Sequence, residues 1–345
     1  MSYSTAPGIS SAASSALSAK NSTRSSISHY IKEIGRGRKG ARALTREQAA
    51  DLFSHVLDGT VTDLEIGAFC LAMRIKGETP QEMAGFLDAT RARSALVHSA
   101  PGARPVVVLP SYNGARKLPA LTPLLALLLA REGLPVLLHG MSTENSRIPV
   151  QNMLLALDVS QHVATTLIAN GDIRFADTAQ LNPGLARLLQ VRRVIGLRNS
   201  AHSVVKLMNP CAGASLVVAS YTHPEYAISM AETLEQVQAN AMLLRGTEGE
   251  SVADPRRMPP MQGFVNGERC TLETTQPGPL PTTPDLPKAI DAESTTAYIR
   301  SVMAGSDAVP TSIARQVEHI LRLCAQIEHT KQPSATLNSL TAMPL

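Results

Sequence analysis

The chain has 345 residues, of which 44% are hydrophobic and 17% are charged, and its formal net charge is +4. This length allows two domains, and no apolar run reaches the roughly 18 residues that a membrane helix requires. The four cysteines form no CxxC pair, which argues against a zinc site and against a disulfide framework. We therefore expect a cytoplasmic protein without a membrane partner. Its mild basicity permits a polyanionic partner but does not demand one.

The N-terminal segment is rich in Ser and Ala and contains no acidic residue. Mitochondrial transit peptides share this composition, but they carry several arginines on an amphipathic helix. Here only Lys20 and Arg24 are charged. We predict that residues 1–26 form a disordered tail.

Residues 27–98 have a helical pattern throughout, which predicts a small helical bundle domain. Three segments begin with a threonine in the N-cap position: Thr45, Thr62 and Thr79. Glycines suited to ending a helix close the first two, and a proline suited to the first helical position opens the third: Gly59, Gly77 and Pro80.

Residues 99–345 have a different pattern, in which short apolar runs alternate with helices. The runs "PVVVLP", "LPVLLHG", "SLVVASY" and "NAMLLRG" are typical of buried strands. Helices are expected from about residues 121, 150, 178 and 224, and two more over 291–304 and 309–328, after a Pro- and Thr-rich stretch. This alternation predicts an α/β domain with a mostly parallel sheet flanked by helices. Helices near 178–208 are candidates for packing on the bundle.

The stretch "VLPSYNGARKLPALTP" is an apolar strand, a polar loop and then a helix. Loops of this shape bind anionic groups through backbone N–H donors and a helix N-terminus. This loop has a single glycine, Gly114, and it carries Arg116 and Lys117 where a tight phosphate-binding loop would have small residues. Either it still binds a small phosphate, or it faces a larger polyanion.

Basic residues are concentrated in three regions. Between Arg24 and Arg46 the chain has seven basic residues and one acidic residue, and residues 178–224 contain five basic residues and no acidic one. A segregated distribution of this kind is typical of nucleic-acid-binding proteins. The candidate phosphate contacts are Arg36, Arg38, Lys39, Arg42, Arg116, Lys117, Arg192, Arg193, Arg198 and Lys206.

Several motifs occur in the order that the anthranilate phosphoribosyltransferase-like family (glycosyltransferase family 3) shows. "PSYNGARK" falls at its Gly-rich loop, "LLHGMS" at its Lys-His-Gly-Asn motif, "IGLRNSAHSVVKLMNP" at its Arg-containing helix, and "RGTEGESV" at its metal-binding segment. The segments "IKEIGRGRKGAR", "RIKGE", "RNSAH", "THPEY" and "GTEGE" resemble most closely the YbiB-type DNA-binding branch. The likeness extends from about Ile27 onward. It implies the family's fold, a homodimer paired through the helical domain, where "AFCLAMRI" supplies apolar surface, and nucleic-acid binding in place of transfer.

The sequence departs from the transferase pattern at the catalytic and metal-binding positions. Leu138 and Met141 stand where the resemblance implies lysine and asparagine, and Ser251 and Val252 stand where it implies the acidic pair that holds magnesium. Neither of the last two replaces a carboxylate as a magnesium ligand. Glu248 and Glu250 are the alternative metal ligands if the backbone is shifted. We predict no catalytic residue, no metal and no cofactor.

The expected function is non-enzymatic, sequence-tolerant binding of DNA, and of RNA as well, by a homodimer. The alternatives are a divergent phosphoribosyltransferase that uses phosphoribosyl pyrophosphate with an unidentified acceptor, and a scaffold that binds only protein. With no tryptophan and 3% aromatic residues, extensive base stacking is not expected. Tyr221 and Tyr226 are expected in the core, and His139 and His202 as structural residues.

Overall fold

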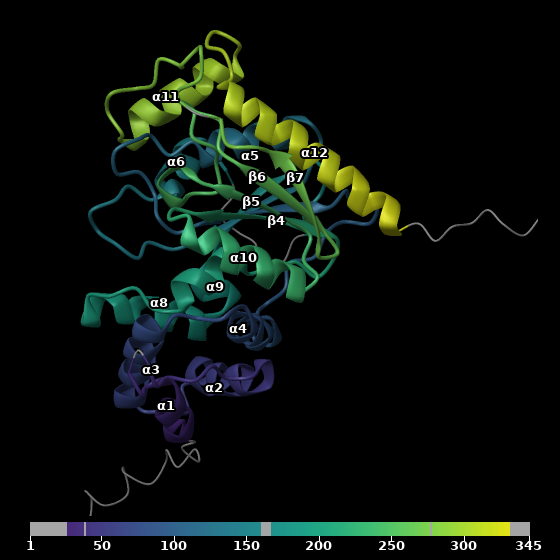
Figure 1. Ribbon diagram of the computed structural model, residues 1–345. Helices are drawn as coiled ribbons and strands as arrows, with labels where there is room; N and C mark the ends of the chain where they lie inside the picture. The colour runs from purple at the N-terminus through teal and green to yellow at the C-terminus, as the bar shows by residue number, and fades with distance from the viewer. Residues whose placement is uncertain (1–25, 38, 160–166, 277, 332–345) are drawn as a thin grey trace, which may run out of the picture.

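The computed structural model describes residues 26–37, 39–159, 167–276 and 278–331, and Figure 1 shows a helical bundle beside a sheet that is covered by further helices. The bundle contains α1 (Ser28–Ile34), α2 (Arg46–Asp58), α3 (Asp63–Lys76) and α4 (Pro80–Ala92). The three predicted threonine N-caps are confirmed, because each accepts a hydrogen bond from the backbone N–H three residues later, within a capping box. The rings of Phe53, Phe69 and Phe86 pack against one another in the bundle core.

The sheet has seven strands in the order β3-β2-β1-β4-β5-β6-β7. The first five in this order are parallel, and β6 and β7 add an antiparallel hairpin at one edge. The strands are β1 (Val106–Ser111), β2 (Val136–Gly140), β3 (Ile173–Asp177), β4 (Ser215–Tyr221), β5 (Ala241–Arg245), β6 (Met261–Val265) and β7 (Glu268–Glu273). A helical bundle joined to a mostly parallel sheet confirms the predicted fold class.

Helices cover both faces of the sheet. They are α5 (Thr122–Arg131), α6 (Val150–Ala156), α7 (Thr178–Leu181), α8 (Pro183–Ile195), α9 (Ala201–Leu207), α10 (Glu225–Gln236), α11 (Ala292–Met303) and α12 (Thr311–Lys331). Alternate residues of β1 point into two cores. Val106 and Val108 pack in the core that includes the bundle and α8 to α10, whereas Val107 and Leu109 pack in the core that includes α5, α6, α11 and α12. In the described part of the chain, no helix is long and apolar enough to cross a membrane.

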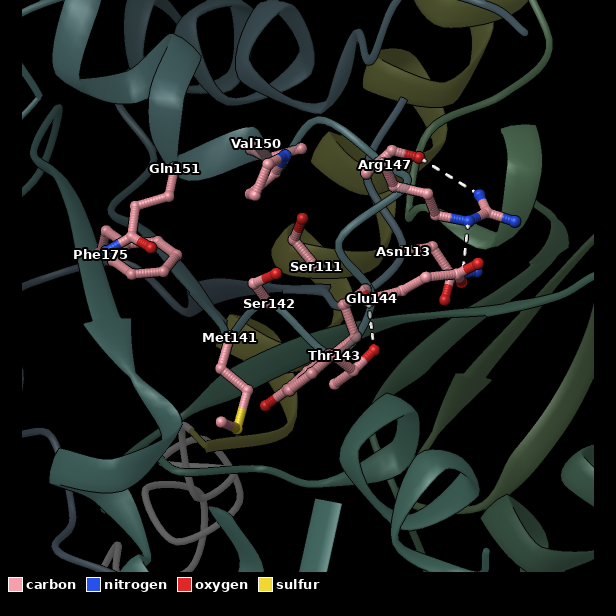
Figure 2. Close-up of a pocket in the computed structure, with 13 residues that line it drawn as sticks. Ser111, Asn113, Met141, Ser142, Thr143, Glu144, Arg147, Val150, Gln151 and Phe175 are labelled. Carbon is pink, nitrogen blue, oxygen red and sulfur yellow. Dashed lines mark hydrogen bonds and ion pairs between the residues drawn. The ribbon is translucent and has the colours of Figure 1, made fainter. Parts of the chain in front are cut away.

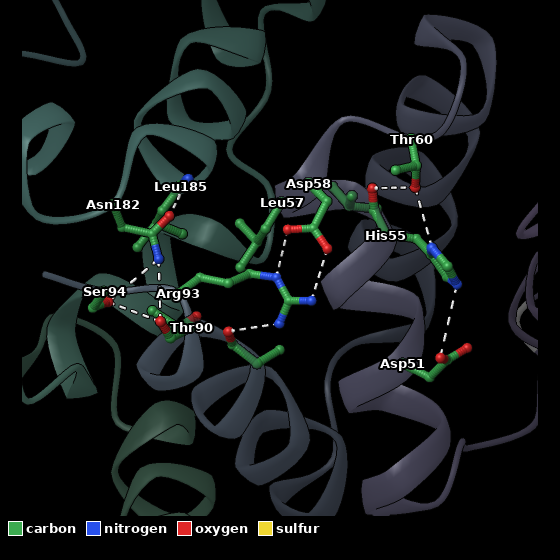
Figure 3. A network of polar contacts seen from close by, with 12 residues as sticks. Asp51, His55, Leu57, Asp58, Thr60, Thr90, Arg93, Ser94, Asn182 and Leu185 are labelled. Atoms are coloured by element: carbon green, nitrogen blue, oxygen red, sulfur yellow. Dashed lines mark hydrogen bonds and ion pairs between the residues drawn. The ribbon is translucent and has the colours of Figure 1, made fainter. Parts of the chain in front are cut away.

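Helices α7 and α8 pack on the bundle. Asn182 Nδ2 donates to Thr90 O at 3.1 Å (Figure 3). Arg187 Nη2 donates to Leu57 O at 2.9 Å. The two backbones approach so closely at Gly184 that an added Cβ would lie 2.2 Å from Leu57 O. The bundle is therefore held at a fixed position beside the α/β domain, and α4, α9 and α10 meet between them.

Strands β3, β6 and β7 are absent from the predicted elements. β3 contains charged residues, so it lacks the continuous apolar run by which the central strands were found. β6 and β7 are joined at Asn266–Gly267, which both have positive φ angles (50° and 82°), as a two-residue hairpin turn requires. This Asn-Gly pair is a sequence signal for the hairpin.

Candidate functional site

A cleft of about 550 Å³ lies between the bundle and the α/β domain. Its bundle wall is the end of α3 and the start of α4. The other walls come from the β1–α5 loop, from α9, and from β4 with the start of α10. Because β1 and β4 are parallel, their carboxyl ends lie at the same edge of the sheet, where ligands bind in open α/β folds.

Basic side chains dominate this cleft. It is lined by four of the predicted phosphate contacts and by two further arginines: Arg116, Lys117, Arg198 and Lys206, together with Arg74 and Arg147. Arg74 and Arg147 were not predicted, because each stands next to at most one other basic residue in the sequence and only the fold brings them to the others. Two carboxylates, Glu78 and Glu248, also line the cleft. Glu78 accepts a hydrogen bond from Ser200 Oγ at 2.6 Å, and Glu248 accepts two from backbone N–H groups.

The basic side chains of the cleft repel one another. Burial lowers the pKa of Arg198, and the positive charges of Arg192, Arg147 and Arg74 lower it further. Burial also lowers the pKa of Lys206 to about 8, with Arg198 contributing in the same direction. Arg198 donates to the neutral Asn113 side chain at 3.2 Å, and Lys206 Nζ donates to Ser220 O at 3.3 Å. An anion bound here would relieve this repulsion.

Arg192 and Arg193, at the end of α8, lie beside the cleft rather than in it. Arg192 donates to Glu144 at 2.9 Å, and the same carboxylate contacts Arg147 at 3.4 Å. A hydrogen bond from Ser146, together with these two arginines, lowers the pKa of Glu144 to about 2. Figure 2 shows Glu144 and Arg147 at a smaller hollow beside the β1–α5 loop. Glu144 therefore links Arg192 to Arg147 of the cleft, and its negative charge neutralises part of the positive charge of these two arginines.

The predicted contacts near the N-terminus lie outside the cleft. Arg36 is paired with Glu33 at 2.6 Å, Arg42 lies 3.7 Å from the same residue, and Lys39 is exposed. Arg38 lies outside the described residues. We call Arg36, Lys39 and Arg42 the N-terminal basic run. None of these three residues lines the cleft, so the N-terminal basic run and the cleft are separate surfaces.

A buried carboxylate connects these two surfaces. Glu82 Oε1 accepts from Leu44 N at 2.9 Å, just after the N-terminal basic run. Its Oε2 accepts from Lys76 Nζ at 2.6 Å and from Thr79 N at 2.9 Å. Thr79 itself lines the cleft. The run therefore ends against the turn that forms the bundle wall of the cleft.

Four backbone N–H groups of the β1–α5 loop already have carboxylate acceptors within the protein. The N–H groups of Asn113 and Gly114 donate to Glu250, and those of Arg116 and Lys117 donate to Glu248. The two glutamates weighed as alternative magnesium ligands are thus both held by the loop. Ser251 and Val252, at the positions of the family's acidic pair, are buried, and Ser251 Oγ donates to Pro110 O at 2.8 Å. Within the described ranges, no group of three or more His, Cys, Asp or Glu side chains is arranged to hold a metal ion.

The two histidines considered structural are buried. His139 Nδ1 lies 2.7 Å from Tyr112 Oη, and His202 Nδ1 lies 3.3 Å from the Asn199 carbonyl. Burial lowers the pKa of each to about 3, so both are neutral at neutral pH and contribute no charge to the cleft.

Of the two tyrosines expected in the core, only Tyr221 is buried, and the placement of Tyr226 was wrong. Tyr226 is 38% exposed because it lies in the first turn of α10, at the cleft. The ring of His223 lies 6.5 Å from that of Tyr226.

The bundle, the sheet and the cleft between them define an anthranilate phosphoribosyltransferase-like fold. Anthranilate phosphoribosyltransferase (TrpD) from Thermus thermophilus superposes with a TM-score of 0.63 at 21% identity, over 88% of this chain and 90% of that one. The Saccharomyces cerevisiae enzyme, in a structure with PRPP and Mg, superposes with a TM-score of 0.65 at 14% identity, over 86% and 88%.

Sequence comparison gives the same assignment. Residues 28–94 match the model for the helical bundle domain of the glycosyl transferase family. The chain is 37% identical over 293 residues to "Uncharacterized protein YbiB" of Escherichia coli K12, which covers 83% of this chain and 91% of that protein. It is 27% identical to anthranilate phosphoribosyltransferase of Methylobacterium nodulans, over 81% and 83%. The chain belongs to the anthranilate phosphoribosyltransferase-like family, glycosyltransferase family 3.

Proposed function

We propose that this protein binds nucleic acids, both DNA and RNA, through Arg and Lys contacts to phosphate, with little sequence preference and without catalysing transfer. The observation that carries the proposal is the cleft itself. Six basic side chains line it, Arg198 and Lys206 are partly desolvated there, and both acidic side chains at the cleft accept hydrogen bonds from the protein. Phosphates would replace the counterions of these cations, and counterion release would supply much of the binding free energy.

The size of the cleft limits how a polymer would use it. A volume of about 550 Å³ is typical of small-molecule pockets, so a duplex is too large to enter. We propose that a strand end or an unpaired stretch occupies the cleft. Neighbouring phosphates would then contact Arg192 and Arg193 on one side and the N-terminal basic run on the other.

We further propose that the protein binds as a homodimer paired through its bundle. Leu64, Leu71 and Ile75 of α3 are 83%, 49% and 56% exposed, and their spacing of seven and four residues places them on one helix face. Val194 and Leu197, near the end of α8, are also exposed. Two-fold pairing would present two copies of each basic surface to one polymer and raise apparent affinity by about 10² or more. Sedimentation that shows only monomer at micromolar concentration would contradict the pairing.

The direct test is a series of fluorescence-anisotropy titrations with single-stranded DNA, duplex DNA and RNA of several sequences, at two ionic strengths. If six or more phosphates are contacted, affinity should fall on the order of a thousandfold between about 50 and 200 mM salt. All sequences should bind alike, and a strand with unpaired ends should bind more tightly than a blunt duplex. The absence of binding to any nucleic acid at low salt would refute the proposal and favour a protein scaffold.

The second candidate is a divergent phosphoribosyltransferase, which the shared fold and the preserved cleft favour. Its test is whether phosphoribosyl pyrophosphate with magnesium raises the melting temperature more than phosphoribosyl pyrophosphate alone. A magnesium-dependent rise, followed by release of pyrophosphate, would support the enzyme. Equal rises with and without magnesium would indicate that the cleft binds the compound only as an anion.

A further inference from the structure

The β1–α5 loop has the donor arrangement of an anion site, and the chain fills that site itself. Four of its backbone N–H groups donate to two carboxylates. Asn113 N and Gly114 N each lie 2.8 Å from Glu250 Oε1, whereas Arg116 N and Lys117 N lie 2.7 and 2.9 Å from the two oxygens of Glu248. Backbone N–H groups that converge in this way bind anionic groups such as phosphates.

Glu250 is held as a buried anion. Only 1% of the residue is exposed, and its second oxygen accepts from Ser111 Oγ at 2.5 Å and from Thr122 Oγ1 at 3.3 Å. Burial of a carboxylate is costly unless hydrogen bonds compensate it, and here four donors do so. If this carboxylate were absent, four donors would face an enclosed space with no acceptor.

Residues 248–250, which carry the two carboxylates, pack closely against the β1–α5 loop. Glu248 has a φ of 53°, a conformation that side chains with a Cβ rarely adopt. Its carbonyl oxygen accepts from Asn113 Nδ2 at 2.7 Å. Between the glutamates, an added Cβ at Gly249 would lie 2.0 Å from the same Nδ2. This contact and the positive φ of Gly249 (87°) disfavour any other residue at position 249, and the segment leaves these four donors no room for a free anion while it is in place.

We propose that residues 248–250 are a tethered anion that occupies a diphosphate site in the β1–α5 loop. The two carboxylates belong to residues that are separated only by Gly249, and they take the places of two linked phosphate groups. The native loop is therefore closed to free phosphate and diphosphate, and removal of the carboxylates creates a site for them. This inference does not rest on nucleic-acid binding, because it is argued from the backbone N–H groups of the loop, although the loop and Glu248 also line the cleft.

The experiment is chemical rescue of Glu250→Ala and of Glu248→Ala with inorganic phosphate and pyrophosphate. Loss of the Glu250 carboxylate should lower the melting temperature, and millimolar pyrophosphate should restore at least about 3 °C more than it adds to the native protein at equal ionic strength. The native protein sets the baseline, since the cleft cations would also attract pyrophosphate. Glu232→Ala, which removes an exposed carboxylate from α10, is the control for net charge and should respond as the native protein does.

The conservative variant separates shape from charge. Glu250→Gln keeps one acceptor oxygen and fills the space, so it should be destabilised less than Glu250→Ala and should not be rescued by pyrophosphate. If Glu250→Ala does not fold, Glu248→Ala serves alone, with equilibrium dialysis of pyrophosphate as the measurement. The proposal is overturned if no glutamate variant binds or responds to either anion more than the native protein does.

Discussion

The cleft and the N-terminal basic run carry the same kind of charge in opposite settings. In the run, Arg36 and Arg42 lie at the surface and share Glu33. In the cleft, Arg198 and Lys206 are partly desolvated and repelled by neighbouring arginines. A cation that is already paired with a carboxylate and solvated gains little from a phosphate, whereas one held among like charges gains more. A count of basic residues along the sequence favours the N-terminal region, with seven against five in residues 178–224, but the structure favours the cleft.

The largest effect is expected when Arg198 and Lys206 are both replaced by alanine. Affinity for every nucleic acid should fall by about 10²-fold, and the slope of log K against log salt should lessen by about 2, because two phosphate contacts are lost. Anisotropy titrations at several salt concentrations measure both quantities. Unchanged affinity would place the polymer on another surface.

Replacement of Arg36, Lys39 and Arg42 together by alanine should weaken binding by about tenfold or less, despite removing one more charge. The smaller loss per residue follows from exposure and from the Glu33 pairing. If the triple variant loses more affinity than the double cleft variant, the comparison between the two regions is reversed. A change in preference between nucleic-acid sequences would instead indicate that these residues contact base edges.

The pH dependence should distinguish the regions as well. Phosphate binding favours charged Lys206, whose pKa in the free protein is lowered to about 8, so affinity should fall as pH rises through 8. Between pH 7 and 9 the loss should approach about tenfold, because the charged fraction falls to about a tenth. The arginines remain charged in this range. Lys206→Arg should therefore bind with an affinity that is nearly constant over this interval, and an equal pH response in that variant would exclude Lys206 as the titrating group.

The smallest effect is expected for Tyr226→Ala. The ring is exposed at the cleft beside His223, and stacking of one base contributes about 1–3 kcal/mol in single-strand sites. We expect a loss of about fivefold for single strands, at the lower end of this range because the ring is only partly exposed, and little loss for blunt duplexes. Tyr226→Phe, which keeps the ring, is the control and should retain the native affinity. Equal losses for both kinds of ligand would show that no base stacks there.

The fold followed from signals that are local in sequence. Threonine N-caps, glycine helix ends and apolar runs such as residues 105–110 depend on neighbouring residues, and the structure confirms them. The Asn266–Gly267 turn is also a local signal, from which the β6–β7 hairpin could have been predicted.

The site could be predicted only in part, because it depends on contacts between distant residues. Arg198 and Lys206 were found as members of a basic region, but Arg74 and Arg147 join them only through the fold. The interaction of Glu250 with a loop more than 130 residues earlier leaves no pattern in the sequence. The family resemblance of this segment made Glu248 and Glu250 alternative metal ligands, whereas their geometry makes them acceptors for backbone N–H groups.

The buried Glu82 carboxylate would influence how a long ligand is spaced between the two basic surfaces. Glu82 accepts hydrogen bonds from Leu44 N, from Lys76 Nζ and from Thr79 N. These bonds connect the segment that follows the N-terminal basic run to the rim of the cleft. If a strand spans both surfaces as proposed, the number of nucleotides between them would be set by the Glu82–Lys76 ion pair and not by a flexible linker. Replacement of Glu82, which lies outside the cleft, should therefore make the length of strand that the protein covers less sharply defined.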